Sequence, residues 1–354
     1  MYCLELAGED DPFALREAEA AAAGIEPLAT GLALAGHVSP DRLRGLAYTH
    51  AADELVARTE AGLDAAELAL AAAAPFDCEG TVAVRARDVQ GLTGVDTQAA
   101  ERRLGKVLVE QGYEVDLDDP DHELRALFSA EEAAGIADED ADGTGDGPDR
   151  IPANEGVCVL GWLAAESERG FSERRPTDRP FFQPGSMAPM DARALVNMAG
   201  AAPGRRILDP MCGTGGTLIE AGLVGADLLG TDAQWKMVRG TKENLDALVP
   251  DADSAVARAD ATRLPLRAGA VDGVVFDAPY GRQSKIATHR LEDLVEGALA
   301  EVHRVSSEAA TCVLMADRSW HDAAVAAGWR VTDQFERRVH ATLTRYVHVL
   351  EKSP

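Results

Sequence analysis

The sequence predicts an α/β protein in which an α+β region precedes a doubly wound domain. Two observations support this prediction. From Asp191 onward, short apolar strands alternate with helical segments, which is the pattern of a mostly parallel sheet covered by helices. Before that point the segments are more varied and include alternating runs such as Thr81–Arg87 (TVAVRAR), which are typical of strands with one exposed face.

The bulk composition narrows the class of protein. At 354 residues the chain is long enough for two or three domains. It has no apolar run of about 18 residues, so we expect no membrane contact. The first residues carry acids and no basic segment before an apolar stretch, so we expect a cytoplasmic protein without a signal peptide. The five cysteines are scattered and form no C-x-x-C pair, so neither a disulfide framework nor a metal site is expected.

The net charge of −26 is extreme, and the basic residues comprise 29 Arg and only 5 Lys. This pattern fits a protein from a high-salt cytoplasm, where surface carboxylates keep proteins hydrated, and we hypothesise a halophilic source. A negative total ordinarily argues against nucleic-acid binding. In molar salt, however, electrostatic attraction is screened to roughly 3 Å, so binding would depend on local arginine contacts, stacking and shape.

The first half of the chain predicts two small regions. Residues 1–48 combine a strand at Tyr2–Leu6, a helix around Phe13–Ala23 and a further apolar run at Gly31–Val38. Residues 49–166 predict alternating helices and strands, followed by an acidic, glycine-rich loop and a last strand. In order, these are the helix Asp53–Ala74, the strand Thr81–Arg87, the helix Gln98–Gln111, the strands Glu114–Leu117 and Glu123–Ser129, the loop Ala137–Arg150 and the strand Gly156–Ala164.

The second half predicts a linker and one larger domain. Residues 167–185 are rich in Arg and Pro and predict an extended linker. Residues 186–354 carry the βα alternation and end in an antiparallel hairpin. The strands of this domain are Arg206–Asp209, Leu228–Thr231, Val271–Asp277 and Thr311–Ala316, and those of the hairpin are Trp329–Phe335 and Thr342–Leu350.

A glycine-rich turn follows the first strand of this domain. The segment Ile207–Thr217 (ILDPMCGTGGT) reads as strand, tight turn and helix start, where glycines let a ligand approach the backbone and the free N–H groups of the helix. Asp232 ends the next strand, nineteen residues after Gly213. A carboxylate at about this spacing accepts hydrogen bonds from ribose hydroxyls in nucleotide sites. A plain turn and a surface acid remain the alternative interpretation.

Two further strand ends carry polar residues. Asp260 follows an alternating stretch and could accept a hydrogen bond from an adenine amino group, although alone it is a weak signal. The segment Val274–Gly281 (VVFDAPYG) places a carboxylate, a proline and an aromatic ring at the edge where open α/β sheets bind ligands. This D-x-P-Y pattern is the most specific local signal in the chain.

These residues resemble the class I methyltransferases that act on exocyclic amines, whose fourth motif reads (D/N/S)-P-P-(Y/F). Together with Phe181–Pro189, Asp209–Gly216, Trp235–Gly240 and Asn244, they look like the archaeal tRNA (guanine(10)-N2)-dimethyltransferase family. Val82–Ser129 with Gly156–Ala164, including Arg102–Gly105 and the turn at Pro120, resembles a THUMP domain, an RNA-binding module. The likeness covers nearly the whole chain and is weakest before residue 50.

The resemblance implies a Rossmann-like domain with a mostly parallel seven-stranded sheet, S-adenosylmethionine as cofactor, tRNA as partner and a monomer that methylates guanosine N2, most simply at position 10. It implies that Asp277 and the carbonyl of Ala278 accept hydrogen bonds from the amine, with Pro279 beside them and Tyr280 stacked on the base. The implied cofactor residues are Met187, Asp209, Pro210, Cys212, Gly213, Thr214, Gly215, Asp232, Asp260 and Ala261. Ala278 stands where the family motif has its first proline. The alanine keeps the backbone carbonyl at this position but lacks the rigidity of proline.

Arginine and lysine side chains near the THUMP-like region are the candidates for RNA contact: Arg102, Arg103, Lys106, Arg174, Arg175 and Arg179. Solvated surface charge is the competing interpretation for each. Other functions also stay open, namely methylation of another tRNA guanine such as position 6 or of ribosomal RNA, a DNA adenine-N6 methyltransferase, a non-catalytic RNA-binding protein and a dehydrogenase. The THUMP-like region disfavours the DNA enzyme, and the D-x-P-Y pattern has no role in the dehydrogenase.

Overall fold

The computed structural model describes all residues except 9, 74–78, 132–155, 280–287, 341–342 and 353–354. The described chain divides into two compact units. The first unit comprises Met1–Arg44 and Tyr48–Ser167, and the second comprises Gly45–Ala47 and Glu168–Pro354. The predicted loop Ala137–Arg150 lies outside the described residues.

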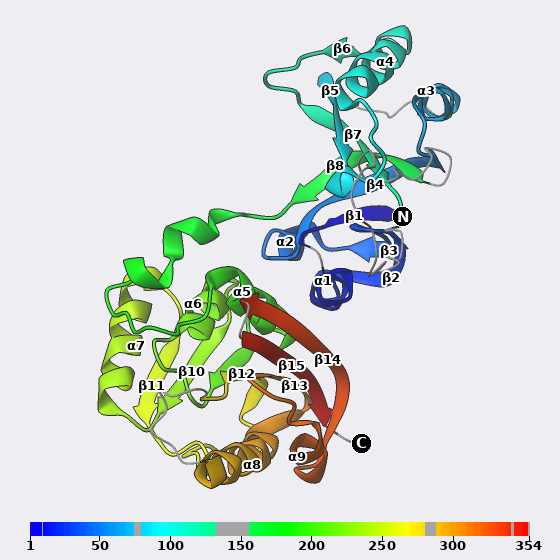
Figure 1. Ribbon diagram of the computed structural model, residues 1–354. Helices are drawn as coiled ribbons and strands as arrows, with labels where there is room; N and C mark the ends of the chain where they lie inside the picture. Colours follow the sequence, from blue (N-terminus) through cyan, green and yellow to red (C-terminus); the bar gives the residue numbers. More distant parts are fainter. Residues whose placement is uncertain (9, 74–78, 132–155, 280–287, 341–342, 353–354) are drawn as a thin grey trace, which may run out of the picture. The chain divides into compact units, whose positions relative to one another are not determined.

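The first unit is built on one eight-stranded sheet with the order β2-β3-β1-β4-β8-β7-β5-β6 (Figure 1). Strand β1 pairs antiparallel with β4, so the sheet joins residues on both sides of the predicted boundary at residue 48. Its elements are β1 (Tyr2–Leu6), α1 (Asp11–Ala18), β2 (Ala22–Ala29), β3 (Leu32–Val38), α2 (Pro40–Leu43), β4 (Thr49–Glu60), α3 (Leu63–Ala72), β5 (Thr81–Asp88), η1 (Val89–Gly91), α4 (Thr97–Glu110), β6 (Glu114–Val115), β7 (His122–Ser129) and β8 (Val157–Glu166).

The predicted helix Asp53–Ala74 is wrong in its first half. Residues up to Glu60 belong to strand β4, and the helix α3 begins only at Leu63. Strand β4 lies between β1 and β8, so ladder hydrogen bonds on both sides override the helical propensity of the segment. Asp53 occupies a buried position of this strand, where an apolar residue is expected, so the sequence does not show the alternating apolar pattern of a strand.

A second difference concerns the predicted helix Phe13–Ala23. Helix α1 ends at Ala18, and Ala22 starts the strand β2, which the sequence did not predict. Most residues of β2 are exposed or half-buried, so the strand lacks the apolar alternation that would mark it.

The second unit contains a seven-stranded sheet with the order β11-β10-β9-β12-β13-β15-β14. Pairing is parallel from β11 to β13 and antiparallel in the hairpin β14–β15, which confirms the predicted architecture. Its elements are η3 (Gly170–Arg174), η4 (Pro176–Asp178), α5 (Pro189–Met198), β9 (Arg206–Asp209), α6 (Gly216–Leu223), β10 (Asp227–Asp232), α7 (Trp235–Leu248), β11 (Ser254–Arg258), β12 (Val271–Asp277), α8 (Thr288–Val305), β13 (Ser306–Ala316), α9 (His321–Ala326), β14 (Trp329–His340) and β15 (Leu343–Lys352).

Helices cover both faces of this sheet, with α5–α7 on one side and α8 and α9 on the other (Figure 1). A core of buried side chains joins α8 and α9 to the sheet and includes Val274, Phe276, Val295, Leu299 and Trp329. Because β9 to β12 run parallel, their carboxyl ends meet at one edge, and the chain order reverses beside β9. That edge is where such sheets bind ligands.

No described helix is long and apolar enough to cross a membrane. No group of three or more His, Cys, Asp or Glu side chains in the described part of the chain is arranged to hold a metal ion.

Candidate functional site

Three aspartates end neighbouring strands at the carboxyl edge of the second unit. Asp209 ends β9, Asp232 ends β10 and Asp277 ends β12. Asp209 and Asp277 line one cavity of about 140 Å³, together with the predicted residues Met187, Cys212 and Thr214. The fold therefore brings side chains from distant parts of the sequence to a single cavity.

The glycine-rich turn connects β9 to α6. Gly213 and Gly215 have φ angles of 52° and 78°, a left-handed conformation that favours glycine. A Cβ atom on Gly215 would also lie 2.8 Å from Cγ2 of Thr241. The hydroxyl of Thr241 donates to the carbonyl of Gly213 at 2.8 Å, which fixes the turn. The turn leads directly into the N-terminus of α6, whose first N–H groups have no partner within the helix.

A segment before α5, residues 181–187, is tied to this turn by Asn244. The side chain of Asn244 accepts a hydrogen bond from the N–H of Phe181 at 2.8 Å and donates to the carbonyls of Phe181, at 2.8 Å, and Thr214, at 2.9 Å. A Cβ atom on Gly240 would lie 2.0 Å from the ring of Phe181, so only glycine fits there. The sequence analysis named Asn244 and Gly240 only as part of the family resemblance. In the structure, Asn244 binds the segment 181–187 to the turn, and Gly240 leaves room for the ring of Phe181.

Asp209 is the buried base of the turn, with 3% of its surface exposed. It accepts hydrogen bonds from the hydroxyl of Thr217 and from the N–H of Met211. The pKa of Asp209 is raised to about 7, mainly by burial and to a smaller extent by the nearby carboxylates of Asp232 and Asp277, and its two hydrogen bonds oppose the rise.

Asp277 forms an ion pair with Arg345, a residue that the sequence analysis missed. Arg345 lies on β15, is 4% exposed, and also donates from Nε to the carbonyl of Ala316 at 3.3 Å. Burial raises the pKa of Asp277 to about 6, and the guanidinium of Arg345 opposes this rise. The two residues are 68 positions apart, and no local pattern connects them.

Six of the predicted cofactor residues, including Gly213 and Gly215 of the turn, do not line the cavity with Asp209 and Asp277. Asp232 instead accepts the N–H of Gly213 at 3.2 Å and the N–H of Gln234 at 2.8 Å, beside the turn. Asp260 is exposed and accepts the N–H of Thr262 at 2.9 Å, and Ala261 next to it is buried. Pro210 accepts a hydrogen bond from the hydroxyl of Thr231.

The remaining motif residues follow β12. Ala278 is buried, and its N–H donates to the carbonyl of Met315 at 2.8 Å. Pro279 is half-buried. Tyr280, the predicted stacking residue, lies outside the described residues.

The candidate RNA-contacting residues separate into two groups. Arg102 and Lys106 are exposed on α4, and Arg175 is exposed between η3 and η4. Arg103 is paired with Asp64 and Glu67 of α3.

Arg174 and Arg179 form the other group and require a correction. Arg174 binds the buried carboxylate of Glu220, and Arg179 is only 5% exposed. The segment predicted as an extended linker packs into the second unit at these residues, so they are not RNA contacts on an open surface.

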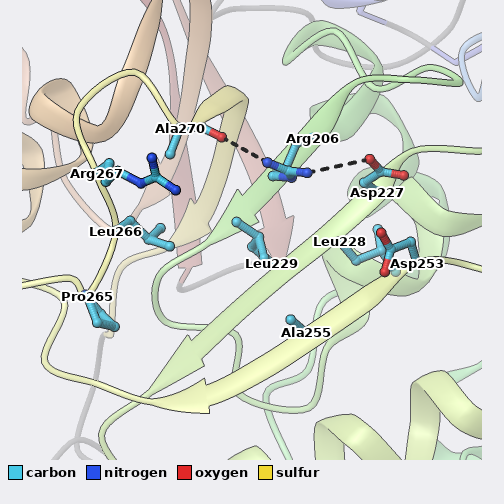
Figure 2. A pocket seen from close by; sticks show the side chains of 10 residues that line it. All are labelled: Arg206, Asp227, Leu228, Leu229, Asp253, Ala255, Pro265, Leu266, Arg267 and Ala270. Carbon is cyan, nitrogen blue, oxygen red and sulfur yellow. Dashed lines mark hydrogen bonds and ion pairs between the residues drawn. The ribbon is translucent and has the colours of Figure 1, made fainter.

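A larger cavity, of about 450 Å³, lies at the opposite edge of the sheet (Figure 2). Arg206 and Asp227, at the starts of β9 and β10, form a long ion pair of 4.0 Å at its wall. None of the chemistry-bearing motifs reaches this edge. We therefore place the candidate site at the smaller cavity, where the glycine turn and two carboxylates converge.

Comparisons with known proteins agree with this geometry. Residues 176–346 match the family model described as an RMKL-like methyltransferase domain. The chain is 34% identical to the tRNA (guanine(10)-N2)-dimethyltransferase of Methanothermobacter thermautotrophicus over 87% of this chain and 83% of that protein. It is 30% identical to the enzyme of the same name from Pyrococcus abyssi, over 77% and 74% of the two chains. The crystal structure of TrmN from Thermus thermophilus covers 99% of both chains with a TM-score of 0.50 at 24% identity, and shows the same fold.

Proposed function

This chain belongs to the tRNA (guanine(10)-N2)-dimethyltransferase family, whose members use S-adenosylmethionine to methylate N2 of guanosine in tRNA. We propose that the cavity between the glycine turn and Asp277 is its active site. The observation that carries this proposal is the convergence of Asp209, the turn and Asp277 on one cavity. We further propose position 10 as the target, because the two relatives are named for that position, and we propose that the protein is a monomer.

The residues present fit the cofactor. The left-handed glycines let a ligand approach the backbone, and the start of α6 offers free N–H groups to it. Asp232 lies beside the turn, where it accepts the N–H of Gly213. Met187, Cys212 and Thr214 would surround the methionine end, and Asp232 and Asp260 would serve the ribose and the adenine. When bound, S-adenosylmethionine supplies a methyl group on a positively charged sulfur, which is a strong electrophile.

Asp277 would act on the nucleobase. The lone pair of the guanine amine is delocalised into the ring, so the amine is a poor nucleophile. A carboxylate that accepts a hydrogen bond from the amine favours a geometry in which the lone pair is free to react. Asp277 can accept this bond when ionised, and Arg345 holds its carboxylate in place. As the new N–C bond forms, the bond between the methyl carbon and the sulfur would break and leave its electron pair on the sulfur, and one amine proton would leave to Asp277 or through it to water.

The segment 181–187 would position the cofactor and exclude water. Its ties to Asn244, and the contact between Ser186 and Thr214 at 3.1 Å, keep one wall of the cavity fixed to the turn. A fixed wall holds the reacting atoms in line without further reorganisation.

The test is mass spectrometry of nucleosides from unmodified tRNA incubated with the protein and S-adenosylmethionine carrying a labelled methyl group. We expect label in N2-methylated guanosine, and its loss when the guanosine at position 10 is replaced by adenosine. The variant Asp277→Ala should reduce turnover by at least about 100-fold while retaining cofactor binding. Label in another nucleoside, or near-normal turnover of Asp277→Ala, would refute the proposal.

A further inference from the structure

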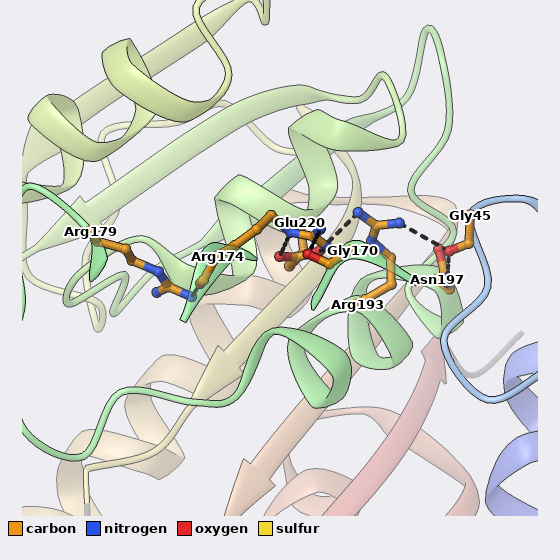
Figure 3. Close-up of polar contacts among 7 residues, drawn as sticks. All are labelled: Gly45, Gly170, Arg174, Arg179, Arg193, Asn197 and Glu220. Carbon is orange, nitrogen blue, oxygen red and sulfur yellow. Dashed lines mark hydrogen bonds and ion pairs between the residues drawn. The ribbon is translucent and has the colours of Figure 1, made fainter. Parts of the chain in front are cut away.

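A buried cluster of charges covers one side of helix α6. Glu220 is completely buried and accepts hydrogen bonds from Nε and Nη2 of Arg174, at 2.9 Å and 3.1 Å. Nη2 of Arg193 lies 2.8 Å from the same carboxylate. Figure 3 shows these side chains with Arg179 beside them and Gly45, whose carbonyl accepts from Arg193 and Asn197.

Arg179 is the member of this cluster that the protein leaves partly unsatisfied. It is 5% exposed, and its Nη2 makes one long hydrogen bond, of 3.4 Å, to the carbonyl of Arg174. Its Nε and Nη1 have no hydrogen-bond partner among the residues that the structure describes. Buried donors without partners are rare in folded proteins, and unpaired buried charges are rarer still.

The charges of the cluster are also unequal. The guanidinium groups of Arg174 and Arg193 pair with the single carboxylate of Glu220, and Arg179 is a third positive charge close to them. The charged groups that act on Arg179 are Glu220, already bound by two other arginines, and Arg174, which repels it. One more negative charge would reduce this excess of positive charge and could accept from the open donors of Arg179.

The open donors lie next to the proposed cofactor cavity. A Cβ atom on Gly216 would lie 3.0 Å from Nη1 of Arg179. Gly216 is the first residue of α6 and lines the cavity, so Nη1 of Arg179 lies directly behind the wall at which the helix presents its N-terminus. A helix N-terminus and an unpaired guanidinium both favour an anion at this place.

We propose that Arg179 binds the α-carboxylate of the methionine moiety of S-adenosylmethionine, an inference that rests on the proposed function. The carboxylate is the one anionic group of this cofactor. An RNA phosphate is the weaker explanation, because Arg179 is 5% exposed and lies beside Gly216, and a phosphodiester would have to enter with its two sugars. Arg174 would then act through Arg179, holding it beside Glu220.

The test is calorimetric binding to the full chain of two ligands that differ in one group, S-adenosylmethionine and its decarboxylated form. The wild-type protein should prefer the carboxylated ligand. Arg179→Met should weaken binding of that ligand by at least about tenfold and leave binding of the decarboxylated one nearly unchanged. Gly216→Ala, which places a methyl group against Nη1, should have the same selective effect without removing the charge. Arg175→Met, an exposed neighbour, is the matched control and should change neither.

The possible failures can be told apart. Wild-type protein that binds neither ligand would refute the proposed function together with this inference. If the wild type binds and Arg179→Met weakens both ligands equally, or neither, the inference alone is overturned and Arg179 is structural. If Arg179→Met does not fold, Gly216→Ala decides on the same criterion.

Discussion

The two units bury arginines in different ways. In the first unit, Arg125 lies between Glu5 and Asp53, both of which are 1% exposed, and Arg87 also pairs with Glu5. Two guanidinium groups there meet two carboxylates. In the second unit, two guanidinium groups pair with one carboxylate, that of Glu220, and a third arginine, Arg179, keeps open donors.

The difference separates structural charge from functional charge. The first cluster links strands β1, β4, β5 and β7 and is complete without a ligand, so it belongs to the framework of the sheet. The second has open donors on Arg179, next to Gly216 of the cavity wall, so it is suited to bind a negative group. Burial of charged groups alone therefore does not tell a structural cluster from a ligand-binding one. The ratio of guanidinium groups to carboxylates in the cluster distinguishes the two.

The largest expected effect tests the balanced cluster. Arg125→Met leaves two buried carboxylates without their main partner and should lower the free energy of unfolding of the first unit by about 3–5 kcal/mol. Urea titration of the full chain measures this loss. Arg87→Met is the control, because Arg87 is half-exposed and its removal should cost less than about 1 kcal/mol. Equal effects of the two variants would mean that burial does not set the importance of these pairs.

The pair of Arg345 and Asp277 sharpens the comparison, because here one arginine meets one carboxylate at the proposed active site. The pKa of Asp277 is raised to about 6, so turnover should fall as the pH drops through that value and the carboxylate is protonated. Arg345 lowers this pKa, so Arg345→Met should move the acidic limb to higher pH and cut turnover at pH 7 by roughly tenfold.

Single-turnover rates from pH 5 to pH 9 would measure this shift. Arg337→Met, on the neighbouring strand β14, is the control and should keep the wild-type profile. If Arg345→Met lowered the rate equally at every pH, the arginine would only support the fold.

The effect of Arg179→Met on the stability of the protein tests the cluster around Glu220 independently of cofactor binding. Removing a buried cation whose donors are open should change the free energy of unfolding in the absence of cofactor by less than about 1 kcal/mol, or increase it. Thermal and urea unfolding without ligand would show this. A loss as large as that of Arg125→Met would contradict the distinction between the two units.

The smallest effect concerns exposed charge. Arg102 is exposed on α4 of the first unit, where we propose a tRNA contact. Arg102→Gln should weaken tRNA binding modestly and lower the slope of log affinity against log salt by about 0.7–0.9. Fluorescence titrations at several salt concentrations measure the slope, and Arg175→Gln offers a comparison in the second unit. An unchanged slope would remove Arg102 from the RNA-binding surface.

Much of the second unit could be predicted because its signals are local. A strand followed by glycines in left-handed conformations, as at Gly213 and Gly215, needs only consecutive residues to be recognised. The first unit was harder, because the buried Asp53 interrupts the apolar pattern of β4 and the exposed β2 carries no such pattern.

The sequence by itself therefore determined the α/β class, the glycine turn and the strand ends that carry Asp209, Asp232 and Asp277. Only the tertiary structure decided that Arg345 meets Asp277, that β4 is a central strand, and that Arg179 is buried beside α6 rather than exposed. The physical reason is that backbone conformation depends on neighbouring residues, whereas a buried ion pair depends on which distant segments share one face of the fold.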